Sequence, residues 1–376
     1  MTDLLTDPTY RRRLLAALVV LLAAAASAQP ARPVSGIDAL GVPVDSLTHA
    51  FAEAHGLPSL VLGVVVDGER RVVGAGEVNG TAPDAHTLYE IGSVTKVFTS
   101  LLLADAVVRG ETTLETPLAD VLGAPVGAHP DGPIRLVDLA THASGLPRLD
   151  DTMDTLPGFD LADPYAAYGA EHLLAFLASV EPATAPGQAQ EYSNVGAGAL
   201  GYVLARRAGS TYESLVAERV LAPLGLRETF ATVPDSLADR FATGHDASGA
   251  ATPHWTFQDA TFGAGGLRST AADMLTVAEA AIRPQATPLA DAIALTLEPR
   301  VPVSGPVEQG LGWVLLPFSG GPTAAFHDGQ TGGFVSFVAA LPDDDIGLVV
   351  FTNRAADVSP LAFDVLGRLR QARAGR

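Results

Sequence analysis

The only lysine in the chain lies three residues after a serine, in the sequence Ser93-Val94-Thr95-Lys96. This spacing predicts that the two side chains lie on one face at the start of a helix, where hydroxyl and amine can meet. The helix dipole favours negative charge at that end, and an amine in a partly desolvated site can accept the serine proton. A Ser-x-x-Lys pattern alone is weak evidence, because it fixes only two of four positions.

The basic residues strengthen a functional interpretation of Lys96. Of 23 basic residues, 22 are arginine and one is lysine. Arginine keeps its proton in proteins, whereas a buried lysine can lose it. A randomly placed lysine would follow a serine at this distance in roughly 5% of cases, because 18 of the 376 residues are serine. The alternative is a leftover lysine without a special role.

A second polar group, Tyr192-Ser193-Asn194, lies after a Pro-Gly turn and before an apolar helix. A phenol near a lysine ammonium can have a lowered pKa and act as a base or proton shuttle. The Asn194 amide can orient both the lysine and a substrate carbonyl. Taken alone, the pattern is more typical of a loop followed by a helix cap.

A third polar group, His327-Asp328-Gly329-Gln330, precedes an expected strand at residues 334–341. Gly329 would let a substrate backbone approach a strand edge closely. His327 would hydrogen-bond a carboxylate or a leaving group, and Asp328 would repel a carboxylate if it faced the pocket. The alternative is a polar hairpin turn with an incidental histidine.

The elements that must position these groups follow from hydrophobic periodicity and turn signals. Asp67-Gly68 between two β-rich runs predicts a hairpin. We expect strands at residues 60–66, 71–78, 312–316, 334–341 and 346–352. We expect helices at residues 37–55, 97–109, 136–142, 170–180, 195–208, 212–221 and 360–373, and a further helix starting at residues 269–273.

This order predicts an α/β (α+β) fold in which a sheet is interrupted by a mostly helical insert and covered by terminal helices. Residues 37–92 and 300–376 would form the sheet subdomain, and residues 93–299 the helical one. Both belong to one domain, residues 37–376. The chain length allows this arrangement.

The N-terminus has the pattern of a secretory signal peptide. Three arginines at residues 11–13 precede a 13-residue apolar run and the sequence Ala26-Ser27-Ala28. We expect residues 1–28 to be removed, residues 29–36 to form a tether, and the product to be periplasmic or secreted without a stable membrane span. An uncleaved membrane anchor is the alternative, although the run is short for a bilayer.

Composition excludes several classes of function. A net charge of −19 disfavours binding to nucleic acid, and the absence of cysteine excludes disulfides and thiol nucleophiles. The nine histidines show no metal-binding spacing, no serine lies in a Gly-x-Ser-x-Gly elbow, and Gly74-Ala75-Gly76 leads to Asn79 where a dinucleotide fingerprint needs glycine.

The three polar groups, in this order, resemble the motifs of the serine β-lactamase and penicillin-binding superfamily. The sequence looks most like the branch with class C β-lactamases, D-alanyl-D-alanine carboxypeptidases, D-aminopeptidases and related esterases. The third motif departs from the Lys-Thr-Gly form. The resemblance covers roughly residues 37–372, including the stretches 88–93, 139–147, 223–226 and 264–270.

The resemblance implies an antiparallel sheet flanked by terminal helices, with the site between sheet and helical part. It implies that Ser93 is acylated, that Lys96 and Tyr192 share the proton transfers, with the base left open, and that Asn194 and His327 contact substrate. The backbone N–H groups of Ser93 and Gln330 would form the oxyanion hole, beside Gly329. His142 and Ser144 would have a packing role, and no metal or organic cofactor is required.

The expected reaction is two-step acyl transfer on a small-molecule or peptide substrate. Because His327 stands in place of the third-motif lysine, a D-amino-acid peptide or a small ester is favoured over a β-lactam. The alternatives are a class C-type β-lactamase and a penicillin-binding sensor without turnover. The sequence gives no indication of the oligomeric state.

Overall fold

The computed structural model describes residues 36–318, 321 and 323–375. The expected signal peptide at residues 1–28 and all but the last residue of the expected tether lie outside this range. Within the described range, no helix combines the length and apolar character needed to cross a membrane.

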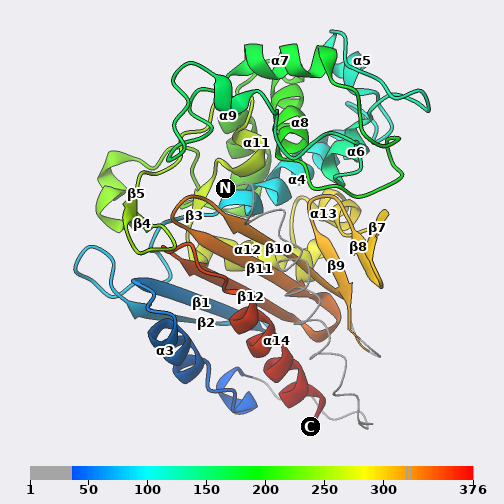
Figure 1. The fold of residues 1–376 in the computed structure, drawn as a ribbon. Helices are drawn as coiled ribbons and strands as arrows, with labels where there is room; N and C mark the ends of the chain where they lie inside the picture. Colours follow the sequence, from blue (N-terminus) through cyan, green and yellow to red (C-terminus); the bar gives the residue numbers. More distant parts are fainter. Residues whose placement is uncertain (1–35, 319–320, 322, 376) are drawn as a thin grey trace.

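An eight-stranded antiparallel sheet forms the centre of the molecule, in the order β2-β1-β12-β11-β10-β9-β8-β7 (Figure 1). Strand β1 pairs with β12, which confirms that strands from both ends of the chain form one sheet. The strands are β1 (Ser59–Val66), β2 (Glu69–Gly76), β7 (Val301–Ser304), β8 (Val307–Gln309), β9 (Val314–Pro317), β10 (Thr323–Gln330), β11 (Val335–Leu341) and β12 (Ile346–Thr352).

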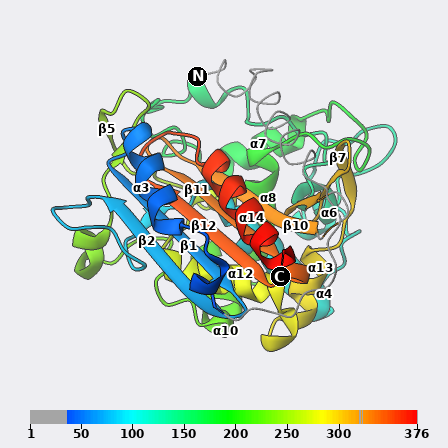
Figure 2. The ribbon, with the colours of Figure 1, turned by 90° about the horizontal axis from the view of Figure 1, so that it is seen from below.

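The sheet is covered on both faces. Helices α3 (Val44–Ala54) and α14 (Ser359–Ala374) lie on one face (Figure 2), and α12 (Ala271–Ile282) packs on the other. The apolar runs of β1, β11 and β12 are buried at every residue, as expected for strands enclosed on both sides. Asp67 and Gly68 both have positive φ, so the predicted β1–β2 hairpin closes with a type I′ turn.

The remaining helices form a layer beyond the α12 face (Figure 1). Helix α4 is buried from Thr95 to Ala106 and is apolar on most sides, as expected for a central helix. The predicted helix at 212–221 is α9 followed by a π-helical turn, Ala217–Leu221. The layer contains α4 (Thr95–Val108), α5 (Leu118–Leu122), α6 (Leu136–Ala140), α7 (Ala170–Ser179), α8 (Asn194–Arg207), α9 (Tyr212–Val216), α10 (Ala222–Leu224), α11 (Phe262–Gly265) and α13 (Ala290–Thr296).

Several strands were not expected from the sequence. They are β7, β8 and β10 of the main sheet, and two small sheets, β3 (Tyr89–Glu90) with β6 (Arg268–Ser269) and β4 (Gly244–His245) with β5 (Ala251–Thr252). Strand β10 is rich in alanine, glycine and aspartate, which have weak strand propensity, and its pairing with β9 and β11 imposes the extended form. His327 to Gln330 therefore lie on a strand and not in a turn.

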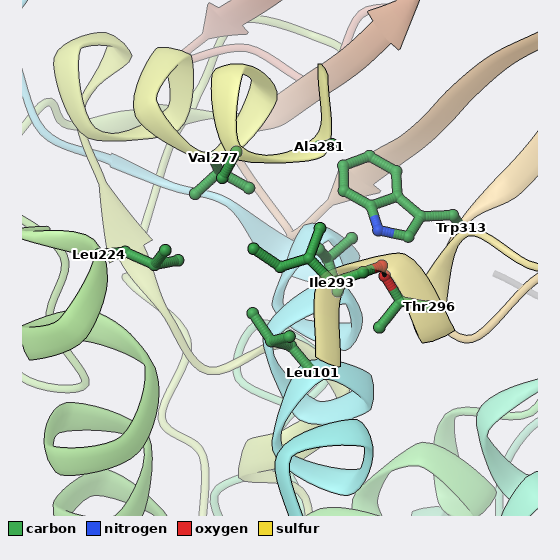
Figure 3. Close-up of a pocket in the computed structure, with 9 residues that line it drawn as sticks. Leu101, Leu224, Val277, Ala281, Ile293, Thr296 and Trp313 are labelled. Atoms are coloured by element: carbon green, nitrogen blue, oxygen red, sulfur yellow. Dashed lines mark hydrogen bonds between the residues drawn. The ribbon is translucent and has the colours of Figure 1, made fainter. Parts of the chain in front are cut away.

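A small apolar cavity lies between α4, α12 and α13 (Figure 3). Its lining includes Leu101, Val277, Ile293 and Trp313, with Thr296 as its hydroxyl-bearing side chain and no titratable group. This lining suits packing between helices and offers no chemistry.

Candidate active site

Ser93 and Lys96 meet where a short 3₁₀ helix, η2 (Gly92–Val94), runs into α4. The Lys96 Nζ donates a hydrogen bond to Ser93 Oγ at 3.0 Å and another to the Ala264 carbonyl at 2.6 Å. Ser93 is partly exposed, whereas Lys96 is only 2% exposed. The structure therefore brings the hydroxyl and the amine together as the spacing predicts.

Neighbouring strands and an ion pair fix the position of Ala264, whose carbonyl accepts the hydrogen bond from Lys96. Strand β6 pairs with β3 directly before η2, and the Leu267 N–H donates to Thr95 Oγ1 at 3.1 Å. Arg268 forms a buried ion pair with Glu90 at 3.1 Å. Two of the stretches that carry the family resemblance, 88–93 and 264–270, thus pack together and fix Ala264 beside the amine.

Lys96 forms no ion pair with a carboxylate in the part of the chain that the structure describes. Burial is the main cause that lowers its pKa, and the charge of Arg148 lowers it further, while the charge of Asp328 acts in the opposite direction. Desolvation favours the neutral form of an amine. The pKa of Lys96 is therefore well below its ordinary value, which favours a neutral amine beside Ser93.

The ring of Tyr192 lies 4.8 Å from Lys96 Nζ, and its hydroxyl is close enough to Ser93 for the serine to influence its pKa. Burial raises the pKa of Tyr192, and this outweighs the opposing effects of Ser93 and of the Arg148 charge. The expectation of a lowered phenol pKa is wrong, because desolvation penalises the phenolate more than nearby cations stabilise it. Tyr192 is a protonated donor in this pocket.

His142 packs directly against Tyr192, with ring centroids 4.3 Å apart. Its Nδ1 accepts a hydrogen bond from the Ser193 N–H at 3.2 Å, so the ring proton of the neutral form is on Nε2. Burial lowers the pKa of His142 and favours this neutral form. The packing role expected from the sequence is thus exerted on the tyrosine of the site, whereas the Ser144 hydroxyl accepts from the Leu146 N–H at 3.3 Å within its own turn.

Asn194 is the first residue of α8, and its carboxamide is half satisfied. Its Nδ2 donates to the Tyr165 hydroxyl at 3.0 Å, while its buried Oδ1 has no partner among the described residues. Ser193 caps the helix by accepting from the Gly196 N–H at 2.9 Å, which fixes the backbone at this point. The Asn194 side chain is therefore held in one orientation, and its Oδ1 is available to accept a further hydrogen bond.

Two glycines let strand β10 and η2 approach each other. A Cβ on Gly329 would lie 2.1 Å from the Ile91 carbonyl oxygen and 3.0 Å from the Ser93 nitrogen, and one on Gly92 would lie 2.8 Å from the Gln330 nitrogen. The space into which a side chain at position 329 would point is filled by the protein's own segment Ile91–Ser93. Glycine is needed there because the two backbones cross in close contact.

The backbone nitrogens of Ser93 and Gln330 lie at this crossing. Strand β9 pairs with β10 only as far as Phe326, so the edge beyond it is not covered by β9. The Thr331 N–H donates to the Phe334 carbonyl, so by alternation the Gln330 N–H points away from β11 and toward that edge. Two backbone donors next to a serine hydroxyl can hold a developing oxygen anion.

His327 is 4% exposed and neutral. Burial and the Lys96 charge lower the pKa of His327 to about 3, and its Nδ1 lies 2.6 Å from the Asp328 carbonyl, to which the neutral ring donates. Its Nε2 is then a lone-pair acceptor. Asp328 is half-buried, and its charge raises the pKa of both Lys96 and Tyr192. The third motif therefore brings a negative charge to the site and no cation.

Arg148 is a cation at the site that the sequence did not single out. Its guanidinium carbon lies 5.0 Å from the Tyr192 ring centroid, and its carbonyl accepts from the Asn194 N–H at 2.9 Å. In the sequence, the feature that could have indicated Arg148 is its position directly after the stretch 139–147, which carries part of the family resemblance. In a chain with 22 arginines that signal is weak. In the described ranges no group of three or more metal-binding side chains is placed to hold a metal ion.

Comparisons with known proteins found relatives along most of the chain. A sequence model of the family described as Beta-lactamase matches residues 44–371. A β-lactamase of Pseudomonas fluorescens is 28% identical over 83% of this chain and 92% of its own length. The D-alanyl-D-alanine-carboxypeptidase/endopeptidase AmpH of Escherichia coli K12 is 29% identical over 92% of both chains.

Solved structures show the same fold. The crystal structure of a class C β-lactamase from Rhodobacter sphaeroides has a TM-score of 0.76 and 26% identity, covering 89% of this chain and 99% of that one. The crystal structure of a β-lactamase from a Sulfitobacter species gives a TM-score of 0.75 at 26% identity, over 90% and 98% of the two chains. The expected α/β fold with an antiparallel sheet is thereby confirmed.

Proposed function

The chain belongs to the beta-lactamase family of serine hydrolases, and on this premise we propose that it acts through a Ser93 acyl-enzyme on an amide or ester. The observation that carries the proposal is the buried Lys96 amine, which lies 3.0 Å from Ser93 Oγ and forms no ion pair with a carboxylate in the described part of the chain. An alcohol next to a neutral amine can be deprotonated as it attacks a carbonyl.

The first step forms the acyl-enzyme. When Lys96 is neutral, the Ser93 O–H becomes the donor and Lys96 Nζ the acceptor of their 3.0 Å hydrogen bond. Ser93 then gives its proton to the Nζ lone pair as Oγ bonds to the substrate carbonyl carbon. The N–H groups of Ser93 and Gln330 hold the resulting oxyanion. When the intermediate collapses, the leaving group takes the Tyr192 proton, and Tyr192 regains a proton from the Lys96 ammonium.

The second step hydrolyses the ester to Ser93. Water attacks the acyl carbon, gives its proton to Lys96 through the same polar groups, and Ser93 leaves with a proton returned by Lys96 or Tyr192. Lys96 acts as the base in this scheme because its pKa is lowered, whereas the pKa of Tyr192 is raised.

One feature favours a D-amino-acid peptide, or a small ester, over a β-lactam as substrate. His327 is neutral and Asp328 follows it, so the third motif lacks a cation to hold the carboxylate of a β-lactam. The unpartnered Asn194 Oδ1 can accept a hydrogen bond from an acyl-side amide N–H, which peptides and common β-lactams both carry. The similarity to class C β-lactamases favours β-lactam hydrolysis as the second candidate.

A hydrolysis panel tests the proposal. Wild type, Ser93→Ala and the exposed control Ser210→Ala are compared on nitrocefin, a D-alanyl-D-alanine peptide, a D-amino-acid amide and a short p-nitrophenyl ester. Ser93→Ala should lose about 10⁴-fold or more in kcat on every substrate that the wild type turns over, and Ser210→Ala should not. Retained activity in Ser93→Ala contradicts the assignment of Ser93 as the nucleophile. Labelling by fluorescent penicillin without any turnover indicates the sensor function instead.

We also propose export to the periplasm or beyond, on the signal pattern at residues 1–28. The intact mass of protein recovered outside the cytoplasm tests this: a chain that begins at Gln29 supports cleavage after Ala28. A full-length chain retained in the membrane fraction contradicts it.

A further inference from the structure

The guanidinium of Arg148 is a partly exposed cation beside Tyr192. Its carbon lies 5.0 Å from the Tyr192 ring centroid, and the guanidinium forms no ion pair and no hydrogen bond with another residue in the ranges 36–318, 321 and 323–375. The nearby Asp150 is committed elsewhere, since it accepts from the Tyr168 hydroxyl at 2.9 Å and from Thr152. The five N–H donors of Arg148 are therefore not engaged by these residues and can serve a ligand.

The backbone places this cation on the Asn194 side of the pocket. The Arg148 carbonyl accepts from the N–H groups of Asn194 and Val195 at 2.9 and 3.3 Å, so the arginine starts beside the helix that carries Asn194. The positive charge of Arg148 lowers the pKa of Tyr165, which burial raises, and adds to the lowering of the pKa of His142 by burial.

Aromatic rings border the same side. Tyr165, which receives the Asn194 hydrogen bond, stacks on Phe257 at 4.9 Å and meets Trp255 edge to face at 5.5 Å. A Cβ on Gly332 would lie 2.8 Å from the Trp255 indole nitrogen, so the wall reaches the strand end that follows Gln330. These three rings form an aromatic wall beside Asn194.

From this arrangement we propose that Arg148 forms an anion subsite, in which its guanidinium binds a carboxylate at the far end of the substrate's acyl group while the aromatic wall covers the carbon chain between them. The proposal rests on the acyl-enzyme function proposed above and specifies its substrate class: acyl groups that carry a terminal carboxylate. A planar guanidinium holds a carboxylate through paired charge-assisted hydrogen bonds, and a neutral acyl group gains nothing from it.

Two matched esters test the subsite, the mono-p-nitrophenyl ester of adipic acid and p-nitrophenyl hexanoate, which differ in the terminal carboxylate. The ratio of their kcat/KM values is measured for wild type, Arg148→Gln, Arg148→Lys and Arg206→Gln, at a pH on the activity plateau. Arg206 is an exposed arginine on α8 that contacts the Tyr202 hydroxyl and serves as the matched control.

Arg148→Gln should lower the ratio by about tenfold to a hundredfold, mostly through KM, Arg148→Lys should restore part of it, and Arg206→Gln should leave it unchanged. An unchanged ratio in Arg148→Gln, or an equal loss on both esters, overturns the subsite while leaving the Ser93 mechanism intact. Turnover that survives Ser93→Ala contradicts the mechanism and not the subsite.

A binding measurement keeps the subsite testable without turnover. The adipate half-ester is titrated calorimetrically into Ser93→Ala protein with Arg148 or with Arg148→Gln. At least tenfold tighter binding with Arg148 supports the subsite. Equal affinities, or no measurable binding with Arg148 present, overturn it.

Discussion

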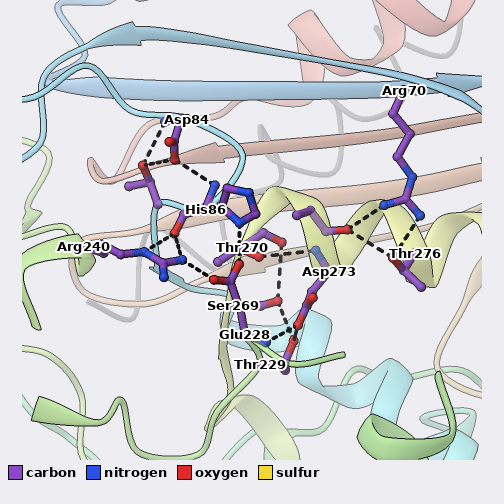
Figure 4. A network of polar contacts seen from close by, with 12 residues as sticks. Arg70, Asp84, His86, Glu228, Thr229, Arg240, Ser269, Thr270, Asp273 and Thr276 are labelled. Carbon is purple, nitrogen blue, oxygen red and sulfur yellow. Dashed lines mark hydrogen bonds and ion pairs between the residues drawn. The ribbon is translucent and has the colours of Figure 1, made fainter. Parts of the chain in front are cut away.

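Two clusters of ionisable side chains lie on the same side of the sheet. They differ in whether the ionisable groups have oppositely charged partners. One is the Ser93 pocket, with Lys96, His142 and His327. The other is the polar network around α12 (Figure 4), in which Glu228 contacts both His86 and Arg240 at 2.6 Å. The network also contains Asp84, Thr229, Ser269, Thr270 and Asp273.

The partner decides the direction of the pKa shift. Burial opposes the ionisation of Glu228, yet the hydrogen bonds from His86 and Arg240 outweigh burial, and the pKa of Glu228 is lowered. Burial opposes the ionisation of Lys96 too, and no ion pair with a described carboxylate compensates. The paired carboxylate Glu228 stays charged, whereas the buried amine Lys96, without a counter-charge, favours its neutral and nucleophile-activating form.

Asp273 lies between these two cases. Burial raises its pKa, although the Thr229 hydroxyl and the Glu228 N–H both donate to it at 2.8 Å. Hydrogen bonds from neutral donors thus satisfy a carboxylate without fully offsetting its desolvation. Around Ser93, too, the hydrogen-bond partners of buried ionisable groups are neutral. The carbonyls of Ala264 and Asp328 accept hydrogen bonds from Lys96 and His327.

The largest expected effect follows from replacing the unpaired amine. Lys96→Arg introduces a cation that cannot lose its proton, and Lys96→Met removes the amine altogether, so each should lower kcat by about 10³-fold or more. Lys96→Met should leave the unfolding free energy unchanged or raise it by about 1 kcal/mol, because a buried amine without a counter-charge is replaced by an apolar chain. Steady-state kinetics and urea unfolding measure both. Near-normal rates in Lys96→Arg contradict the base assignment.

The pH dependence of kcat/KM sharpens the same comparison. Since the base must be neutral, activity should be present above the pKa of Lys96 and fall about tenfold per pH unit below it. Because that pKa is lowered, the acid limb should lie well below the ordinary lysine value of about 10.4. A plateau that begins only near pH 10 would show that the pocket does not favour the neutral amine.

In the network, the expected effect is on stability and not on rate. Asp273→Ala removes the acceptor of the Thr229 hydroxyl and the Glu228 N–H, and should lower the unfolding free energy by about 2 kcal/mol with kcat unchanged. Asp120→Ala is the control, because Asp120 is the third residue of α5, as Asp273 is of α12, but is exposed. Equal stability of the two variants contradicts a role for the buried bonds.

The smallest expected effect concerns Glu228. Its folded-state pKa is below the unfolded value, so its contribution is present above the unfolded pKa and is lost as pH falls through the folded one. Glu228→Gln should lower the unfolding free energy by about 0.5 kcal/mol at pH 7, and by progressively less as the pH falls below the unfolded pKa. Thermal unfolding at pH values between 7 and 3 checks this against Glu53→Gln, a change at an exposed glutamate. A difference that does not shrink as the pH falls contradicts an electrostatic origin.

Much of the pocket was predictable from local sequence. The Ser93–Lys96 spacing places two side chains on one helix face, and Asp67-Gly68 specifies a hairpin, because both depend on the backbone of a few consecutive residues. Strand β10 was not predicted, since its alanines and glycine extend only through pairing with β9 and β11. The place of His327 on a strand was missed for the same reason.

The sequence by itself determined the reactive pair, the order of the three polar groups and the split of the sheet by a helical insert, because residue spacing and periodicity carry that information. Only the tertiary structure decided the protonation states. Burial raises the pKa of Tyr192 and lowers the pKa of Lys96, and it depends on helices and strands far apart in the chain. The tertiary structure alone also placed Arg148 over Tyr192 and the Ile91–Ser93 segment beside Gly329, because contacts of that range leave no local pattern.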